Sequence, residues 1–375
     1  MRACVFDPKS SSGVKLIERK KPHASGGIAI VKVAACGANP VDAKYIIGDK
    51  LPETWMGWAA KRAAGHTPGF DFSGTIVEVS ESSGFKVGDA VYGFACNPAQ
   101  FAVKRLIGSF SEYVAAPLDQ LAKKPEKLSH IEAAGLPLVG TTALQAFIQH
   151  KVREGQRVLV IGASGGVGHI AVQVACHLGA HVTAICSSRN TAFVKDDCGA
   201  GAVLSYDDGD VFAKISEDAK ANGKYDFVLD CVSSADSRDA AASYMAKIEA
   251  MEPPVVKRRA SDGKGTDGHN YVVLGGATSD WGKALLKRFF ALNCFASGRE
   301  LFWIKMPGSR GVLERLAAFA DASGDAAGPK PLKPKIDVQL PFSEESARKA
   351  FDTLRGRRTA GKIVMVMSGT EEGSV

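Results

Sequence analysis

A short glycine-rich segment, Gly162 to Gly168, has residue types and spacing suited to binding phosphate. A pyrophosphate can reach the free N–H groups at the start of a helix only where no bulky side chain stands between them. The usual pattern is G-x-G-x-x-G. Here Gly165 and Gly168 keep that spacing, and Ala163 replaces the first glycine. By itself, this imperfect pattern is also compatible with a plain tight turn between a strand and a helix.

The segments on both sides of the turn favour phosphate binding. Val158 to Ile161 is an apolar run typical of a strand buried in a parallel sheet. From Val167 to Leu178 the apolar residues recur at helical spacing, and Gly179 is placed to end that helix. His181 to Cys186 then has the pattern of a second strand. Strand, glycine turn, helix and strand in this order form half of a dinucleotide-binding fold.

The segment after the second strand indicates which dinucleotide is bound. NAD sites usually carry an acidic residue about 20 positions past the glycines, bonded to the ribose 2′-hydroxyl. Cys186 to Asn190 contains no acidic residue. A carboxylate would repel a 2′-phosphate, whereas Arg189 and the hydroxyls of Ser187 and Ser188 would bind one. The charge of this segment therefore favours NADPH, and a solvated loop with an incidental arginine is the alternative.

Composition places the chain among ordinary globular proteins of two domains. It has 375 residues, with 45% apolar and 23% charged residues. The formal net charge is +7, but lysine and arginine are spread along the chain, which favours solvated surface over a nucleic-acid-binding patch. The eight cysteines lie far apart without a C-x-x-C pair. This spacing argues for reduced thiols in a reducing compartment and against a zinc-binding lobe.

The pattern of apolar runs argues against a membrane span. No run reaches the roughly 18 residues that a membrane helix needs. The N-terminal segment enters a strand-like run at once, without the core of a signal peptide. We therefore expect a cytoplasmic protein, with peripheral association with an organelle left open.

Short strands and turns dominate the first part of the chain, and helices alternate with strands after it. The alternating part begins with a helix predicted over Ile131 to Gln149. Such alternation predicts a doubly wound parallel sheet. The segment Ala250 to Asn270 is rich in proline, glycine and basic residues, which predicts a loop insertion. The predicted division is residues 1–127 for a β-rich domain, 128–308 for the nucleotide domain, and 309–375 for a return to the first domain.

Six ordered motifs resemble the zinc-independent quinone oxidoreductase branch of the medium-chain dehydrogenase/reductase superfamily. They are Asn39 to Asp42, Pro68 to Gly74, Phe85 to Val91, Gly108 to Tyr113, Leu136 to Ala143 and Ala360 to Val364. The resemblance spans nearly the whole chain, and it is strongest to the chloroplast-envelope and reticulon-interacting groups of that branch. It implies an α/β protein with a GroES-like β-rich catalytic domain and a Rossmann nucleotide domain with a doubly wound parallel sheet.

The zinc alcohol dehydrogenases of the same superfamily provide a contrast. Their catalytic metal is held by the cysteine of a G-x-C-x-x-D segment and the histidine of a G-H-E segment. Asn39 and Phe70 stand at these two places here. An amide and a phenyl ring cannot replace thiolate and imidazole on Zn²⁺. Cys36 and His66 lie nearby in the sequence, but no third ligand has a spacing that would join them. We therefore expect no metal.

The resemblance implies that NADPH delivers hydride to a small hydrophobic quinone or enone. Negative charge then grows on the carbonyl oxygen, which needs a hydrogen-bond donor, and a proton must follow. The candidate catalytic donors are Asn39, Lys44 and Tyr45, for which surface or packing roles are the alternatives. The expected cofactor contacts include the three residues that the charge of the loop selects, Ser187, Ser188 and Arg189. The others are Thr142, Ser164, Gly165, Gly166, Val167, Tyr206, Gly275 and Gly276.

Two other functions remain compatible with the sequence. The first is a 2-enoyl-thioester reductase, which belongs to the same superfamily. The second is an NADPH-binding interaction protein with little turnover, for which the basic insertion would be a docking surface. A homodimer is also compatible with the resemblance.

Overall fold

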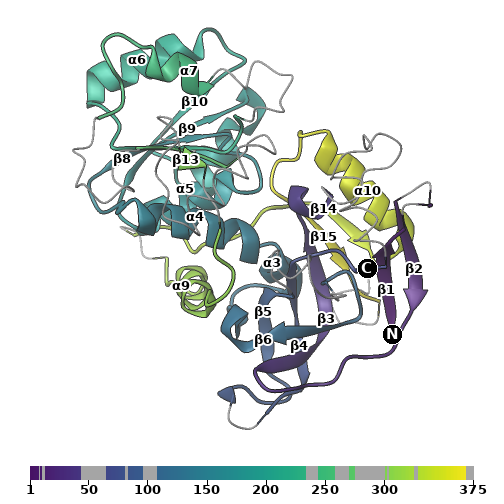
Figure 1. The fold of residues 1–375 in the computed structure, drawn as a ribbon. Helices are drawn as coiled ribbons and strands as arrows, with labels where there is room; N and C mark the ends of the chain where they lie inside the picture. Colours follow the sequence, from purple (N-terminus) through teal and green to yellow (C-terminus); the bar gives the residue numbers. More distant parts are fainter. Residues whose placement is uncertain are drawn as a thin grey trace, which may run out of the picture. The chain divides into compact units, whose positions relative to one another are not determined.

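The computed structural model describes residues 1–7, 9–10, 13–43, 65–80, 83–95, 108–233, 244–257, 270–274, 300–301, 304–324 and 328–368. They form two compact units, whose elements are labelled in Figure 1. The first unit comprises Met1–Thr141, Lys305–Asp321 and Lys333–Val375, and the second comprises Thr142–Ile304 and Ala322–Leu332.

Two sheets build the first unit. The smaller sheet pairs β1 (Arg2–Phe6) with β2 (Val14–Glu18) in antiparallel fashion. The larger sheet has the order β14-β15-β3-β4-β5-β7, and β6 also pairs with β3. Its strands are β3 (Ile28–Ala38), β4 (Asp71–Glu78), β5 (Ala90–Phe94), β6 (Tyr113–Pro117), β7 (Leu121–Lys123), β14 (Ile336–Pro341) and β15 (Lys362–Val366). Because β15 lies antiparallel to β3, the end of the chain completes a sheet that begins near residue 28.

The described helices of the first unit range from three to twelve residues, and the longest of them, α10, packs into the core. They are α1 (Pro40–Ala43), η3 (Leu118–Gln120), α3 (His130–Ala134), α9 (Arg310–Ala320) and α10 (Glu344–Arg355). Phe351 on α10 stacks on Phe110, with ring centroids 5.6 Å apart, and both rings are buried. Apolar residues from β3, β4, β5, β15 and α10 share this core. The unit is therefore the β-rich domain that the sequence predicts.

The second unit contains a six-stranded parallel sheet. Its order is β10-β9-β8-β11-β12-β13, so that β8, the first strand of this sheet along the chain, lies in the middle. The strands are β8 (Arg157–Ile161), β9 (His181–Cys186), β10 (Ala202–Ser205), β11 (Phe227–Asp230), β12 (Tyr271–Val273) and β13 (Glu300–Leu301). This is the doubly wound Rossmann order, in which ligands bind at the carboxyl ends of the strands where the order reverses. The fold class predicted from the sequence is confirmed.

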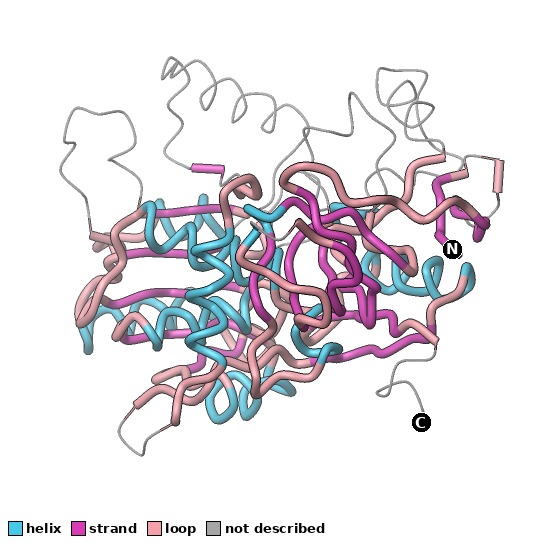
Figure 2. The backbone as a smooth tube through the Cα atoms, turned by 90° about the horizontal axis from the view of Figure 1, so that it is seen from below, coloured by secondary structure: helices cyan, strands magenta, loops and turns pink. Residues whose placement is uncertain are grey.

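Helices cover both faces of this sheet (Figures 1 and 2). The described helices of this unit are α4 (Pro137–Gln149, whose first five residues belong to the first unit), α5 (Gly168–His177), η4 (Ser188–Asn190), the π-helix η5 (Phe193–Asp197), α6 (Val211–Asn222) and α7 (Tyr244–Glu249). Val211, Ile215 and Ala219 of α6 pack against β8 and β11 in one apolar cluster. Four of the five residues of β8 are buried, as expected for a strand covered on both faces.

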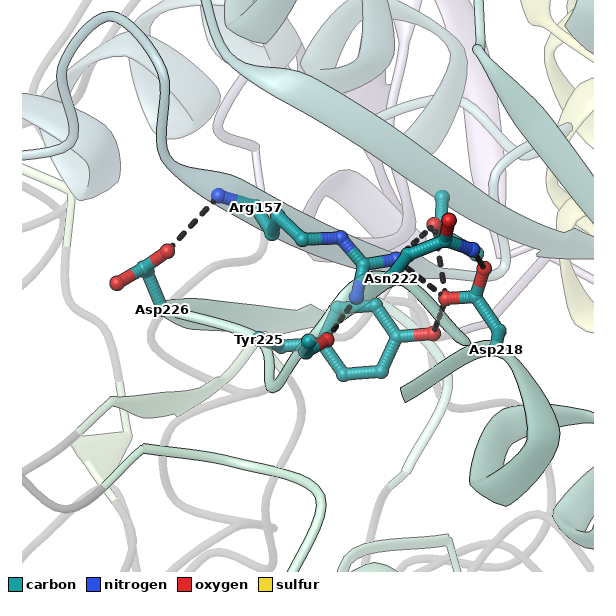
Figure 3. Close-up of polar contacts among 7 residues, drawn as sticks. Arg157, Asp218, Asn222, Tyr225 and Asp226 are labelled. Atoms are coloured by element: carbon teal, nitrogen blue, oxygen red, sulfur yellow. Dashed lines mark hydrogen bonds and ion pairs between the residues drawn. The ribbon is translucent and has the colours of Figure 1, made fainter. Parts of the chain in front are cut away.

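A polar cluster around Arg157 ties the amino-terminal edge of the sheet to α6 (Figure 3). The Arg157 guanidinium bonds to the Asp218 carboxylate at 2.5 Å and lies over the Tyr225 ring, 4.7 Å from its centroid. Tyr225 and Asn222 also donate to Asp218. Since each of these groups has a partner and the cluster lies away from the carboxyl ends of the strands, its role is structural.

The sequence predicts no membrane span and a loop insertion, and the described residues bear on each of these expectations. In the described ranges, no helix is both long and apolar enough to cross a membrane. Most of the predicted insertion, residues 258–269, lies outside those ranges.

Candidate cofactor site

The glycine turn lies at the carboxyl end of β8, where the strand order reverses. Gly162 has φ +76°, a left-handed conformation that favours glycine, and a Cβ there would lie 2.3 Å from Cγ2 of Val232. A Cβ on Gly168 would lie 2.1 Å from the carbonyl oxygen of Gly162. Glycine at both positions therefore lets α5 begin in close contact with the end of the strand.

Unpaired backbone donors line the start of α5. The N–H groups of Gly166 and Val167 have no hydrogen-bond acceptor within the described ranges. The predicted contact residues Ser164, Gly165, Gly166 and Val167 are all half-buried in this turn. Free N–H groups at the amino end of a ten-residue helix attract anions through both hydrogen bonds and the helix dipole. The turn therefore fits the diphosphate of a dinucleotide.

Asn190 joins this turn to the loop that follows β9. Its amide Nδ2 lies 3.1 Å from Ser164 Oγ and 3.1 Å from Ser187 Oγ. Two predicted cofactor contacts from different segments are therefore brought together by a residue that sequence reasoning did not select. The only signal was its position directly after Ser187, Ser188 and Arg189, so the missing information was spatial.

Most of the predicted phosphate-binding side chains are accessible, and Ser187 is buried. Ser188 and Arg189 are exposed after β9, and Tyr206 is 52% exposed after β10. The Tyr206 N–H donates to the carbonyl of Cys186 at 3.1 Å, which places the ends of the two strands side by side. The structure thus brings Ser187, Ser188 and Tyr206 to one edge of the sheet, with Arg189 on the same loop.

An acidic residue also occupies this edge, and sequence reasoning missed it. Oδ1 of Asp207 accepts from the Ser188 N–H at 2.7 Å and from Ser205 Oγ at 2.6 Å. The hydrogen bond from Ser205, followed by that from Ser188, holds the pKa of this exposed carboxyl below its usual range. The loop after β9 contains no acid, but the neighbouring strand supplies one.

Asp230 shapes the loop on the other side of the turn. It ends β11 and is fully buried. Its Oδ1 accepts from the N–H groups of Val232 and Ser233 at 2.9 and 2.8 Å, and its Oδ2 accepts from the Tyr271 hydroxyl at 2.7 Å. The carboxylate therefore fixes the backbone that carries Val232 against Gly162.

In the first unit, residues from three of the family-like motifs form a buried polar cluster. Asn39 donates through Nδ2 to Asp71 Oδ2 at 2.9 Å and accepts through Oδ1 from Lys362 Nζ at 2.5 Å. Lys362 and Asp71 form an ion pair at 3.5 Å, with exposed side-chain fractions of 3% and 0%. The motifs around Asn39, Asp71 and Lys362 are far apart in the sequence, and their polar members meet here.

The cluster holds more negative than positive groups. Asp42 accepts from the Asn39 N–H through Oδ2, while its buried Oδ1 has no hydrogen-bond partner in the described part of the chain. Burial, followed by the charge of Asp71, raises the pKa of Asp42 well above its usual range. Burial likewise lowers the pKa of Lys362. Two carboxyl groups thus share one ammonium in this cluster.

The candidate catalytic residues are only partly described. Asn39 is fully buried and held between Asp71 and Lys362, and its catalytic role stays a prediction. Lys44, Tyr45, Gly275 and Gly276 lie outside the described residues. Thr142 is buried on α4. Among described side chains, no group of three or more His, Cys, Asp or Glu residues is placed to hold a metal. Cys36 and His66 are both buried, and Phe70 packs in the interior.

A Rossmann sheet with a glycine turn at its reversal point, together with a β-rich unit, is typical of nicotinamide-dependent dehydrogenases and reductases. Two family models match the chain: the alcohol dehydrogenase GroES-like domain over residues 25–126 and the zinc-binding dehydrogenase over residues 166–249. The chain belongs to the medium-chain dehydrogenase/reductase superfamily, in its quinone oxidoreductase branch. It is an NAD(P)H-dependent oxidoreductase.

Named relatives show the range of this branch. The chain is 32% identical over 247 residues to the chloroplastic quinone-oxidoreductase QR1 of Triphysaria versicolor, with 62% of this chain and 68% of the relative covered. It is 29% identical to the 2-methylene-furan-3-one reductase of Solanum lycopersicum, covering 90% and 71%. It is also 29% identical to the mitochondrial NAD(P)H oxidoreductase RTN4IP1 of Homo sapiens, covering 90% and 81%.

A solved structure agrees with the fold over nearly the full length. The quinone oxidoreductase from Coxiella burnetii superposes with a TM-score of 0.70 at 27% identity, covering 98% of this chain and 99% of that one. The family predicted from the motifs is therefore confirmed.

Proposed function

We propose that this protein uses NADPH to reduce small hydrophobic quinones or α,β-unsaturated carbonyl compounds. The observation that carries the proposal is the glycine turn with free N–H donors, joined by Asn190 to the loop that contains Arg189. The names of the relatives, which include a quinone-oxidoreductase and a 2-methylene-furan-3-one reductase, support this acceptor class.

The residues of the second unit would bind and orient the dinucleotide. The N–H groups of Gly166 and Val167 would donate to the diphosphate, and Gly168 lets α5 begin close enough to β8 to present them. Arg189, Ser187 and Ser188 would bind the 2′-phosphate, because a guanidinium and hydroxyls are suited to a phosphate dianion. The bound nicotinamide would supply hydride. Thr142, Tyr206, Gly275 and Gly276 complete the proposed set of contacts.

The buried cluster of the first unit would orient the segment that leads to the catalytic candidates. Asn39 is fixed on both sides, and the Asp42 carboxyl is bonded to its N–H, so the turn at Pro40 has a defined conformation. Lys44 and Tyr45 follow within three residues of Asp42. We propose that one of them donates to the carbonyl oxygen of the acceptor, with Asn39 as the third candidate.

Consumption of NADPH against an acceptor panel tests the proposal. The panel contains a benzoquinone, a short enone and a crotonyl thioester, and a Gly168→Val variant controls for contaminating reductases. We expect turnover with the quinone or the enone that is lost in the variant. Faster turnover of the thioester would favour an enoyl-thioester reductase. Tight NADPH binding without turnover of any acceptor would favour the interaction protein. A cytoplasmic location and a homodimer stay predictions.

A further inference from the structure

We propose that Asp207 is a specificity-determining residue that weakens the preference for NADPH, so that the site also accepts NADH. The proposal rests on the proposed function, since it concerns the same dinucleotide site. It depends on the place of one carboxylate at the end of β10, next to the loop that would take the 2′-phosphate.

The pairing of the strands brings Asp207 to that loop. β9 and β10 are parallel, and Ser205 lies opposite Cys186 in their register. The next residues of the two strands therefore leave the sheet together, with Tyr206 and Asp207 beside Ser187 and Ser188. The hydrogen bond of 2.7 Å from the Ser188 N–H to Asp207 confirms that the two segments are in contact.

The Asp207 carboxylate accepts a hydrogen bond from an N–H group that would otherwise be free to bind a phosphate. The Ser188 N–H and the Ser205 hydroxyl both point to the same oxygen of Asp207. A 2′-phosphate bound by Ser188 would have to share this donor with a fixed negative group. The carboxylate also forms no ion pair with another described residue, so Arg189 does not neutralise it. The Asp207 carboxylate is thus a fixed negative charge in the site that would bind the negatively charged 2′-phosphate.

The size of the effect follows from the charges. In water, a unit charge about 6 Å from a phosphate dianion changes the binding constant roughly tenfold at low salt. The same carboxylate does not repel NADH at this place, because NADH carries a hydroxyl there, and a carboxylate can accept its hydrogen bond. Asp207 therefore lowers affinity for NADPH while leaving or improving affinity for NADH.

The neighbouring residue provides a matched control. Asp208 carries the same charge one residue further on, and its side chain is 82% exposed beside Lys214 at 3.6 Å. No hydrogen bond joins it to Ser188 in the described structure. Asp208→Asn therefore changes the net charge of the protein by the same amount as Asp207→Asn without changing the contact that carries the proposal.

The experiment measures dissociation constants by calorimetry for wild type and the two variants. The ligands are NADPH, NADH and the fragment pair adenosine 2′,5′-bisphosphate and 5′-AMP, which differ only in the 2′-phosphate. We expect Asp207→Asn to tighten NADPH and the bisphosphate about three- to tenfold at low salt, with no gain for NADH or 5′-AMP. Asp208→Asn should change every constant less than twofold. The gain should shrink at about 0.5 M salt, where screening is strong.

Two results would overturn the inference while the proposed function stands. One is equal tightening of NADPH and NADH by Asp207→Asn. The other is an identical effect of Asp207→Asn and Asp208→Asn, which would reduce the role of Asp207 to net charge. Failure of the wild-type protein to bind either dinucleotide would instead overturn the proposed function, and the inference with it.

Discussion

Replacing Lys362 by methionine tests whether the buried cluster of the first unit is held by its single cation. At 3.5 Å from Asp71 Oδ2, and with an effective dielectric constant of about 20, the attraction is on the order of 5 kcal/mol. Removing one partner of a buried pair commonly costs about 3–5 kcal/mol, because the other charge is left without compensation. We expect Lys362→Met to lower the free energy of unfolding by about 3 kcal/mol.

The loss of unfolding free energy in Lys362→Met should increase as pH rises. Burial already raises the pKa of Asp71, and the Lys362 ammonium opposes this increase. Without the ammonium, the pKa of Asp71 rises further in the folded state. A carboxyl with a folded-state pKa above its unfolded value binds more protons when folded, so it favours folding less as pH rises. The penalty of Lys362→Met should therefore be larger at about pH 8 than at about pH 5.

Urea unfolding followed by circular dichroism measures both effects. The double variant Lys362→Met with Asp71→Asn should be less destabilised than the sum of the single variants, by roughly 2 kcal/mol, because the unpaired charge is gone. Lys333→Met is the control, since the Lys333 side chain is 68% exposed in its ion pair with Glu132 at 2.9 Å, and a pair with an exposed partner contributes about 1 kcal/mol or less. Additive single effects, or equal losses for Lys362→Met and Lys333→Met, would refute the reasoning.

Three further predictions concern the second unit and its turn. Gly168→Ala should abolish dinucleotide binding in calorimetry because its Cβ would lie 2.1 Å from a backbone oxygen, whereas Gly311→Ala, with open space around it, should not. Arg189→Glu should weaken NADPH at least tenfold more than NADH, and equal weakening would disprove the assignment of that loop. Burial would raise the pKa of Asp218, but hydrogen bonds from Tyr225 and the Arg157 guanidinium hold it below the usual range. Its contribution to stability is therefore present above about pH 4 and lost as pH falls further, and Asp218→Asn should flatten this acid limb in thermal unfolding.

The local patterns in the sequence were sufficient to predict the Rossmann half-fold. The second strand was predicted over His181 to Cys186, the bounds of β9, because an apolar run ended by polar residues has clear limits. The prediction of one continuous helix over Ile131 to Gln149 was wrong. The structure has α3 and α4, separated at Gly135 and Leu136. Pro137 has no N–H to continue a helix, but it is favoured in the first turn of a new one.

Other features had a signal in the sequence that was not used. The helix α6 was not predicted, although Asp210 caps it through a hydrogen bond to the Phe212 N–H at 2.9 Å and Gly223 ends it. The buried cluster had no such signal. Asn39, Asp71 and Lys362 belong to three of the six motifs, but nothing in a single sequence shows that these residues meet.

The missed role of Asp207 has a different cause, which lies in the order of the strands. In a Rossmann half-fold, the acid that selects NAD usually follows the second strand, so the sequence points only to that segment. In the sheet, however, the end of the third strand lies against the same loop, and the register of Ser205 with Cys186 puts Asp207 next to Ser188. The charge near a bound 2′-phosphate would therefore come from the residues after both β9 and β10. Arg189 supplies the positive charge, and Asp207 supplies a negative one. A prediction of cofactor preference in such a sheet needs the residues that follow both strands, taken together.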